Sequence, residues 1–185
     1  MFFNILMNII PEKVARSTAE AFTEFYSNYL PKVFRYISYR ITDTHLAEDL
    51  TAIVFEKALT KFKSYRSEKA AISTWIFRIA RNTLIDHFRV SGRQKTIPLD
   101  RIDNDPKTDE TPEETFLEKE ESKILRQCIS RLSPKEREII SLKFSAEMNN
   151  RQIAGLLGLS DSNVGVILYR AVRKLRDDFT EWHDG

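Results

Sequence analysis

Apolar residues recur along most of the chain at the three- and four-residue spacing of amphipathic helices, and the sequence shows no alternation typical of a strand. The N-terminal half contains three such segments, which predict helices over about residues 18–41, 45–62 and 70–90. Ser17 and Glu20 have the residue types and spacing of a capping box, which predicts the start of the first helix there. Pro31 is expected to kink or split that helix.

The helical pattern is lost after residue 93 and returns near Glu114, across a stretch that contains Pro98, Pro106 and Pro112. It then continues to Leu132, and the run Ser133-Pro134-Lys135-Glu136 has the residues that open a new helix. These patterns predict an all-α fold. Two small helical domains, residues 18–93 and 116–180, are expected to be joined by a flexible acidic linker over residues 94–115.

The net charge of +2 conceals an uneven distribution. Residues 100–121 hold ten acids and three bases, a net charge of −7, which leaves +9 on the rest of the chain. Two basic pieces joined by an acidic one favour a polyanionic partner. The linker is long enough to let the two domains pack on each other, so we expect part of any DNA-binding surface to be hidden in the free protein.

Residues 150–176 have the pattern of a helix-turn-helix, with Gly158 at the turn and Ser160 as the cap of the second helix. Its apolar positions, on one face, are Val164, Ile167, Leu168, Ala171 and Leu175. The other face carries Ser162, Gly165, Val166, Tyr169, Arg170, Arg173, Lys174 and Arg176. Early residues that meet base edges and later cations that meet phosphates are typical of a major-groove reader. The alternative is an amphipathic helix with a solvated basic face.

The segment 73–89 predicts a second nucleic-acid surface. Its inward face consists of Ile76, Ile79, Ala80, Thr83, Leu84 and His87. Trp75, Arg78, Asn82 and Arg89 lie opposite, a combination that suits single-stranded nucleic acid. In the alternative, Trp75 is tucked under the loop 63–71 and the arginines are ordinary surface residues. The preceding segment, 47–57, is apolar on more than one face, which predicts either a partner contact or full burial.

Together these segments resemble the extracytoplasmic-function (ECF) group of the sigma-70 family. The resemblance rests on AEDLTAIVFEKA at 47–58, STWIFRIARNTLIDHFR at 73–89, LSPKERE at 132–138 and the helix-turn-helix, in that order. It implies a factor that binds core RNA polymerase, directs it to promoters and helps to open the DNA, with no catalytic site. It also implies control by an anti-sigma factor. A cytoplasmic location is expected because the sequence offers neither a good secretory signal nor a stretch that could span a membrane.

The same resemblance implies roles for particular residues. The expected polymerase contacts are Asp49, Leu50, Val54, Phe55 and Lys57. The expected contacts to the minus-ten element are Tyr65, Trp75, Arg78, Asn82 and Arg89. The outer face of the second helix of the helix-turn-helix is expected to bind the minus-thirty-five element. The family often has basic or polar residues where this chain has Gly165, Val166 and Ile167.

Other functions fit the sequence less well. A transcriptional regulator that acts without binding polymerase needs a receiver or ligand-binding half, and the alternating strands of a receiver are missing. A recombinase or nuclease needs a carboxylate cluster for metal or a supported nucleophile, which the sequence does not offer. The single cysteine, Cys128, and three scattered histidines predict neither a disulfide nor a metal site, and no cofactor is expected. We expect no membrane insertion.

Overall fold

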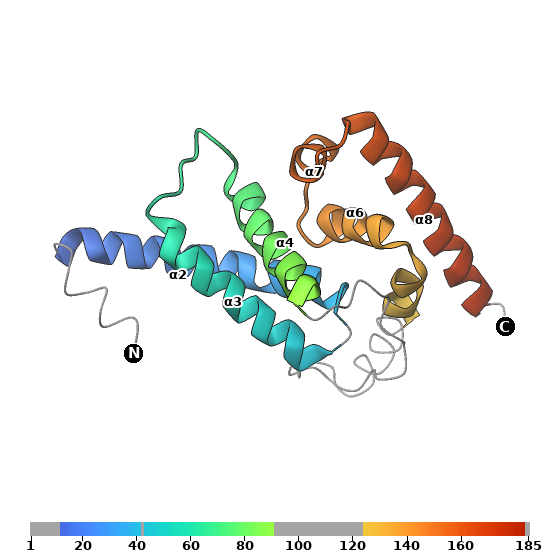
Figure 1. Cartoon of the computed structure of the whole chain (residues 1–185), viewed down its shortest axis with the longest axis horizontal. Coiled ribbons are helices and arrows are strands. Elements are labelled where there is room, and N and C mark those ends of the chain that lie inside the picture. The colour runs from blue at the N-terminus through green and yellow to red at the C-terminus, as the bar shows by residue number, and fades with distance from the viewer. Residues whose placement is uncertain (1–11, 42, 91–123, 184–185) are drawn as a thin grey trace.

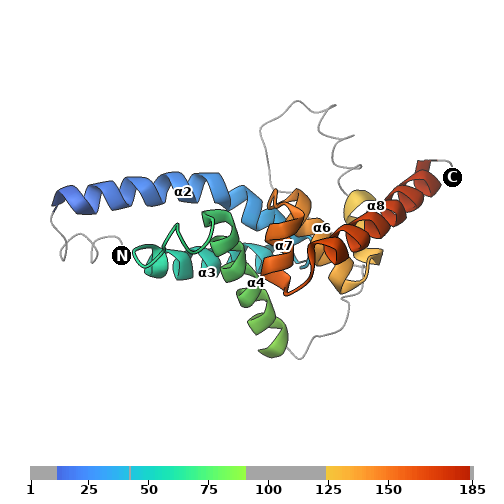
Figure 2. The same ribbon diagram turned by 90° about the horizontal axis from the view of Figure 1, so that it is seen from above.

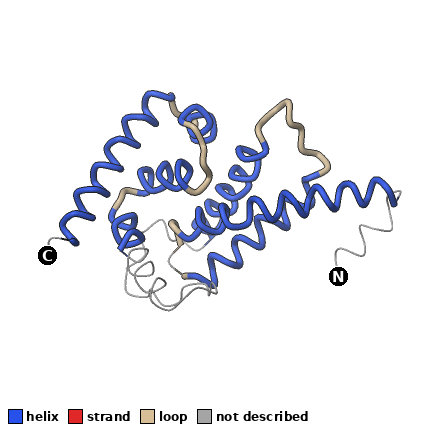
Figure 3. Tube along the Cα trace, turned by 180° about the vertical axis from the view of Figure 1, so that it is seen from behind, coloured by secondary structure: helices blue, strands red, loops and turns tan. Residues whose placement is uncertain are grey.

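The structure, a computed structural model, describes residues 12–41, 43–90 and 124–183, and every regular element in those ranges is a helix (Figures 1 and 3). The all-α prediction is therefore confirmed. The predicted linker, residues 94–115, lies outside the described residues.

Three long helices form the N-terminal half: α2 (Glu12–Ser38), α3 (Thr44–Phe62) and α4 (Ile72–Val90). Helix α2 begins before Ser17, so this serine lies within the helix rather than at its start. The helix also continues through Pro31, and the predicted split is wrong. Phe25 and Val33 are buried on either side of the proline, and this packing holds both parts against the same core.

Helix α3 lies between α2 and α4 and contacts both. Its start is fixed by Asp43, whose side chain accepts a hydrogen bond from the backbone N–H of Leu46. Because two helices cover it, two of its faces are buried, which explains its apolar residues on more than one side. Buried side chains on α3 are Ala47, Leu50, Thr51, Val54, Phe55 and Ala58.

The C-terminal half contains a helical segment, residues 124–131, followed by α6 (Pro134–Phe144), α7 (Asn150–Leu157) and α8 (Asp161–His183). The predicted capping box at the start of α6 is confirmed, because Ser133 and Glu136 each accept a hydrogen bond from the other's backbone N–H. Helix α8 packs on α6 and α7. It forms the edge of the molecule farthest from α2 and α3 (Figure 1).

The two halves pack on each other through α6, which contacts α2, and through α7, which contacts α4. Figure 2 shows α6 and α7 between the N-terminal helices and α8. One cluster of buried apolar side chains runs from Phe25 and Ile76 in the first half to Ile139 and Ile153 in the second. The two halves are thus packed together, an arrangement that the length of the linker allows. Helix α8 lies on the outside of this arrangement, so the packing does not hide it (Figure 1).

Candidate nucleic-acid interface

The turn of the helix-turn-helix has the predicted geometry. Gly158 ends α7 with φ of 69°, a left-handed conformation that favours glycine. The Ser160 hydroxyl accepts a hydrogen bond from the backbone N–H of Asn163 at 3.2 Å, so it caps α8 as expected. A further capping box, between Asn149 and Gln152, fixes the start of α7. Both ends of the turn are therefore held by local hydrogen bonds.

Helix α8 has one buried and one exposed side, as the sequence predicts. Val164 and Ala171 are fully buried, and Ile167, Leu168 and Leu175 are partly buried. The exposed residues of the predicted DNA-binding face are Ser162, Val166, Tyr169, Arg170, Arg173, Lys174 and Arg176, and Gly165 is partly buried. These residues are exposed even with the N-terminal half packed in place, so the packing leaves this face open.

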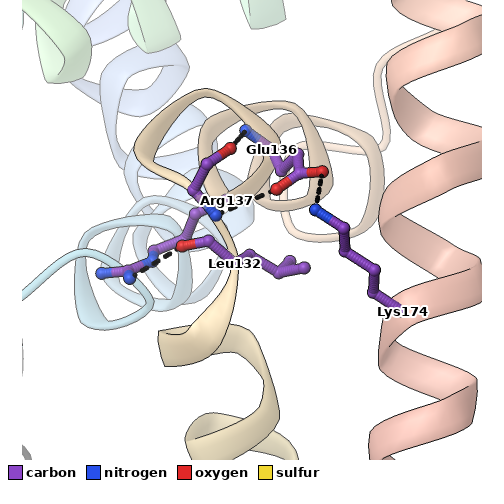
Figure 4. A network of polar contacts seen from close by, with 5 residues as sticks. Leu132, Glu136, Arg137 and Lys174 are labelled. Atoms are coloured by element: carbon purple, nitrogen blue, oxygen red, sulfur yellow. Dashed lines mark hydrogen bonds and ion pairs between the residues drawn. The ribbon is translucent and has the colours of Figure 1, made fainter.

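Lys174 has a structural partner that the sequence did not suggest. Its ammonium donates a 2.6 Å hydrogen bond to Oε1 of Glu136, whose Oε2 accepts from the backbone N–H of Ser133 at 3.0 Å (Figure 4). Burial raises the pKa of the Glu136 carboxyl, but the hydrogen bonds from Lys174 and Ser133 outweigh it and lower that pKa below its ordinary value. Lys174 thus ties α8 to the start of α6, and any phosphate must compete with Glu136 for it.

Helix α4, like α8, has one buried face and one exposed face. All predicted inward residues except His87 are buried, and His87 is partly buried. Arg78, Asn82 and Arg89 are exposed on the other side, and Arg89 lies 3.2 Å from the Asp86 carboxylate. The structure therefore places these three predicted minus-ten contacts on the surface.

Trp75 is not the exposed ring that a stacking platform requires. It is partly buried, with ring centroids 5.3 Å from Tyr65, 5.9 Å from Phe25 and 6.3 Å from Phe62. Tyr65 closes the loop over it by donating its hydroxyl to the Ala70 carbonyl at 2.9 Å. The alternative of a tryptophan tucked under this loop is the one observed, because a shared aromatic cluster buries more apolar surface than an isolated ring.

Three of the five expected polymerase contacts lie in the core. Leu50, Val54 and Phe55 are 4%, 0% and 5% exposed, since α2 and α4 cover them. Their side chains do not form an outer surface in this structure, which corrects the expectation. Lys57 donates a 3.1 Å hydrogen bond to the Thr83 hydroxyl and so joins α3 to α4. Asp49 is exposed.

Sequence reasoning missed a charged cluster between the halves. Oε1 of Glu138, on α6, lies 3.0 Å from Nη1 of Arg40 and 3.0 Å from Nε of Arg81 on α4. A second ion pair, between Lys32 and Glu147, crosses the same boundary at 2.6 Å. Nothing in the local pattern marks Glu138, because its partner Arg81 is 57 residues away in the chain.

Within the described ranges, His, Cys, Asp and Glu side chains do not gather in threes in a way that would hold a metal ion. Among the same residues, the helices are too short or too polar to cross a membrane.

Known structures support the fold. The sigma factor RpoE from Bartonella quintana, solved in complex with the anti-sigma factor NepR, matches with a TM-score of 0.70 and 19% identity, over 87% of this chain and 98% of that one. CnrH, solved in complex with the cytosolic domain of CnrY, matches with a TM-score of 0.60 and 21% identity, over 90% and 94% of the two chains.

Comparison with protein families and relatives gives the more specific assignment. Residues 25–94 match the model of sigma-70 region 2, and residues 122–175 match that of sigma-70 region 4. The ECF RNA polymerase sigma factor BldN of Streptomyces coelicolor is 29% identical over 89% of this chain, which spans 62% of that protein's length. The RNA polymerase sigma factor SigZ of Bacillus subtilis is 33% identical over 76% of this chain and 77% of its own length. The chain therefore belongs to the ECF group of the sigma-70 family of RNA polymerase sigma factors, which are transcription initiation factors.

Proposed function

We propose that this chain binds core RNA polymerase, directs it to specific promoters and helps to open the DNA. In this proposal residues 18–93 bind polymerase and the minus-ten element, residues 94–115 are the linker, and residues 116–180 bind the minus-thirty-five element. The observation that carries it is that α4 and α8 each bury one face and expose a polar or basic one. One chain thus offers two separate surfaces to nucleic acid.

The minus-thirty-five surface is the exposed side of α8. Ser162, Gly165, Val166 and Tyr169 face the bases, because they lie on the first turns after the helix-turn-helix corner. Arg170, Arg173 and Arg176 face phosphates, and Lys174 joins them when it leaves Glu136.

The minus-ten surface is built on Arg78, Asn82 and Arg89, which are exposed on α4. Asn82 binds a base of the opened strand, and the two arginines hold its phosphates. Trp75 and Tyr65 support the loop beside this surface and become available to a base only when that loop moves.

Polymerase binds the exposed side of α3. Asp49 shares this side with Ala52, Ile53 and Glu56, which follow it at helical spacing and are exposed. Leu50, Val54 and Phe55 act from inside, by fixing the helix in the core.

The remaining parts of the proposal follow from the family. The chain has no catalytic role of its own, it acts in the cytoplasm where the polymerase is, and an anti-sigma factor regulates it. Support for the last point comes from RpoE and CnrH, since RpoE was solved with the anti-sigma factor NepR and CnrH with a domain of CnrY.

Run-off transcription with the purified chain and bacterial core polymerase, on genomic fragments that include its own upstream region, tests the proposal. Transcripts are expected only when both proteins are present. Asp49→Lys is expected to abolish polymerase capture, whereas the matched reversal Glu24→Lys, at an exposed position of α2, keeps it. Specific promoter binding by the chain alone, without capture of polymerase, would instead support a helix-turn-helix regulator.

A further inference from the structure

An apolar strip lies on the exposed side of α8, near its start. Val166 and Tyr169 are 48% and 69% exposed. Both follow Ser162 at helical spacing, so the three residues share one face. Both side chains leave apolar area open to water, and the packing of their own domain does not use it, because Val164 and Ala171 already fill the buried side.

The surroundings of the strip indicate what covers it. Arg170, Arg173 and Arg176 are exposed on the following turns, so the strip continues into a cationic surface suited to phosphates. The strip itself lies on the first turns of the second helix, which enter the major groove in a helix-turn-helix protein. The surface that covers the strip is therefore the floor of the major groove of duplex DNA.

Only one base offers a matching apolar group there. Thymine carries a C5-methyl group in the major groove, whereas guanine is bound by arginine or lysine and adenine by asparagine or glutamine. The side chain of Val166 has no hydrogen-bonding group, and the ring of Tyr169 adds apolar area next to it. We propose that Val166 and Tyr169 select the upstream promoter element by packing on thymine C5-methyl groups. This inference rests on the proposed function and names the bases that its upstream surface selects.

The test uses the complex of this chain with core polymerase, which we call the holoenzyme. A duplex library with a randomised upstream element is first selected on the holoenzyme. Each thymine of the selected element is then replaced by uracil, which differs only in lacking the methyl group. Loss of one buried methyl is expected to weaken binding about fourfold at one or two positions, while uracil in the spacer has no effect.

Two variants assign the effect to the strip. In Val166→Ser and Tyr169→Ser, at least one sensitive thymine is expected to tolerate uracil, because the partner of its methyl group is gone. Polymerase capture by both variants should equal that of the unchanged chain, since both side chains point away from the core.

Several results would overturn the inference. The first is a selected element that contains no thymine. The second is an affinity that changes less than twofold when any of its thymines is replaced by uracil. The third is a loss of affinity on uracil replacement that is the same in both variants as in the unchanged chain. If the chain captures no polymerase or the selection enriches no upstream sequence, the proposed function fails and the inference falls with it. A clear selected element without methyl sensitivity refutes the inference alone.

Discussion

Replacing Glu138 by glutamine is expected to weaken the packing between the two halves of the chain. The Glu138 carboxylate is the acid between Arg40 and Arg81, and all three side chains are largely buried, at 13%, 14% and 29% exposed. Arg137 lies close by, and its pKa is lowered by burial and by the charge of Arg40. Glutamine keeps the size of the side chain but removes the negative charge, which leaves Arg40 and Arg81 without the acid between them and with Arg137 nearby.

The expected cost follows from this geometry. Removing one partner of a buried ion pair costs about 3–5 kcal/mol, and an exposed pair contributes less than about 1 kcal/mol. Water reaches Arg81 in part, so we take the lower end, about 3 kcal/mol, for Glu138→Gln. This corresponds to a change of about a hundredfold in the equilibrium between packed and separated halves.

Urea unfolding and small-angle X-ray scattering measure the two consequences. The free energy of unfolding should fall, and the radius of gyration should rise at low urea. The loss should be smaller when Arg81 is already glutamine, because part of the interaction is then missing. Glu147→Gln is the matched control: it removes an acid that also crosses the boundary but is well exposed, so its effect should be much smaller.

The reasoning is refuted if Glu138→Gln changes the free energy of unfolding no more than Glu147→Gln does. It is also refuted if stability falls but the radius of gyration stays the same, since the cluster would then stabilise the helices without holding the halves together.

Three other changes test separate parts of the structure. Lys174→Ala should lower the free energy of unfolding by about 1 kcal/mol at pH 7. Because the pKa of Glu136 is lowered in the folded state, the stabilisation by this ion pair is present above about pH 4.3 and is lost as the pH falls further. Urea unfolding should therefore show a smaller difference between the variant and the unchanged chain at pH 3. Phe25→Ala, in the centre of the aromatic cluster, should cost about 3–5 kcal/mol in thermal or urea unfolding, and a loss under 1 kcal/mol would contradict the packing described. Asn82→Ala should keep polymerase capture but lower the yield of open complex in permanganate footprinting; a pre-melted bubble should restore it, and an equal defect on bubble and duplex would place the role of Asn82 elsewhere.

The helices and the helix-turn-helix could be predicted because the information for them is local. The spacing of apolar residues in α4 and α8 identifies the buried face, and the caps at Ser133 and Ser160 involve neighbours within three residues. Exposed residues on the opposite face, such as Arg78 and Asn82, follow from the same spacing.

Contacts between distant segments could not be predicted in this way. The pattern of α3 shows apolar residues on two sides but not that α2 and α4 cover them, so burial and a partner contact both remain possible from the sequence. The family resemblance favours a polymerase contact for Phe55, whereas the fold places it in the core. Trp75 lies opposite the main buried face of α4, and only the fold of the loop containing Tyr65 places it in an aromatic cluster. Pro31 disfavours a helix by local rules, yet burial on both sides of it outweighs that preference.

The charged cluster links domain packing to nucleic-acid binding through Arg81. This arginine follows Arg78 and precedes Asn82 on α4, but in the packed molecule its Nε donates to Glu138. A phosphate and the Glu138 carboxylate therefore compete for the same guanidinium. Since binding and conformational equilibria are reciprocal, a polyanion that takes Arg81 favours separation of the halves, and separation in turn raises the affinity of α4 for the polyanion. On the exposed side of α8, Lys174 pairs with Glu136 and Arg173 lies 4.0 Å from Asp177. Both of these acids belong to the C-terminal half, so among the residues that the structure describes, the competition at α8 depends much less on how the halves are arranged.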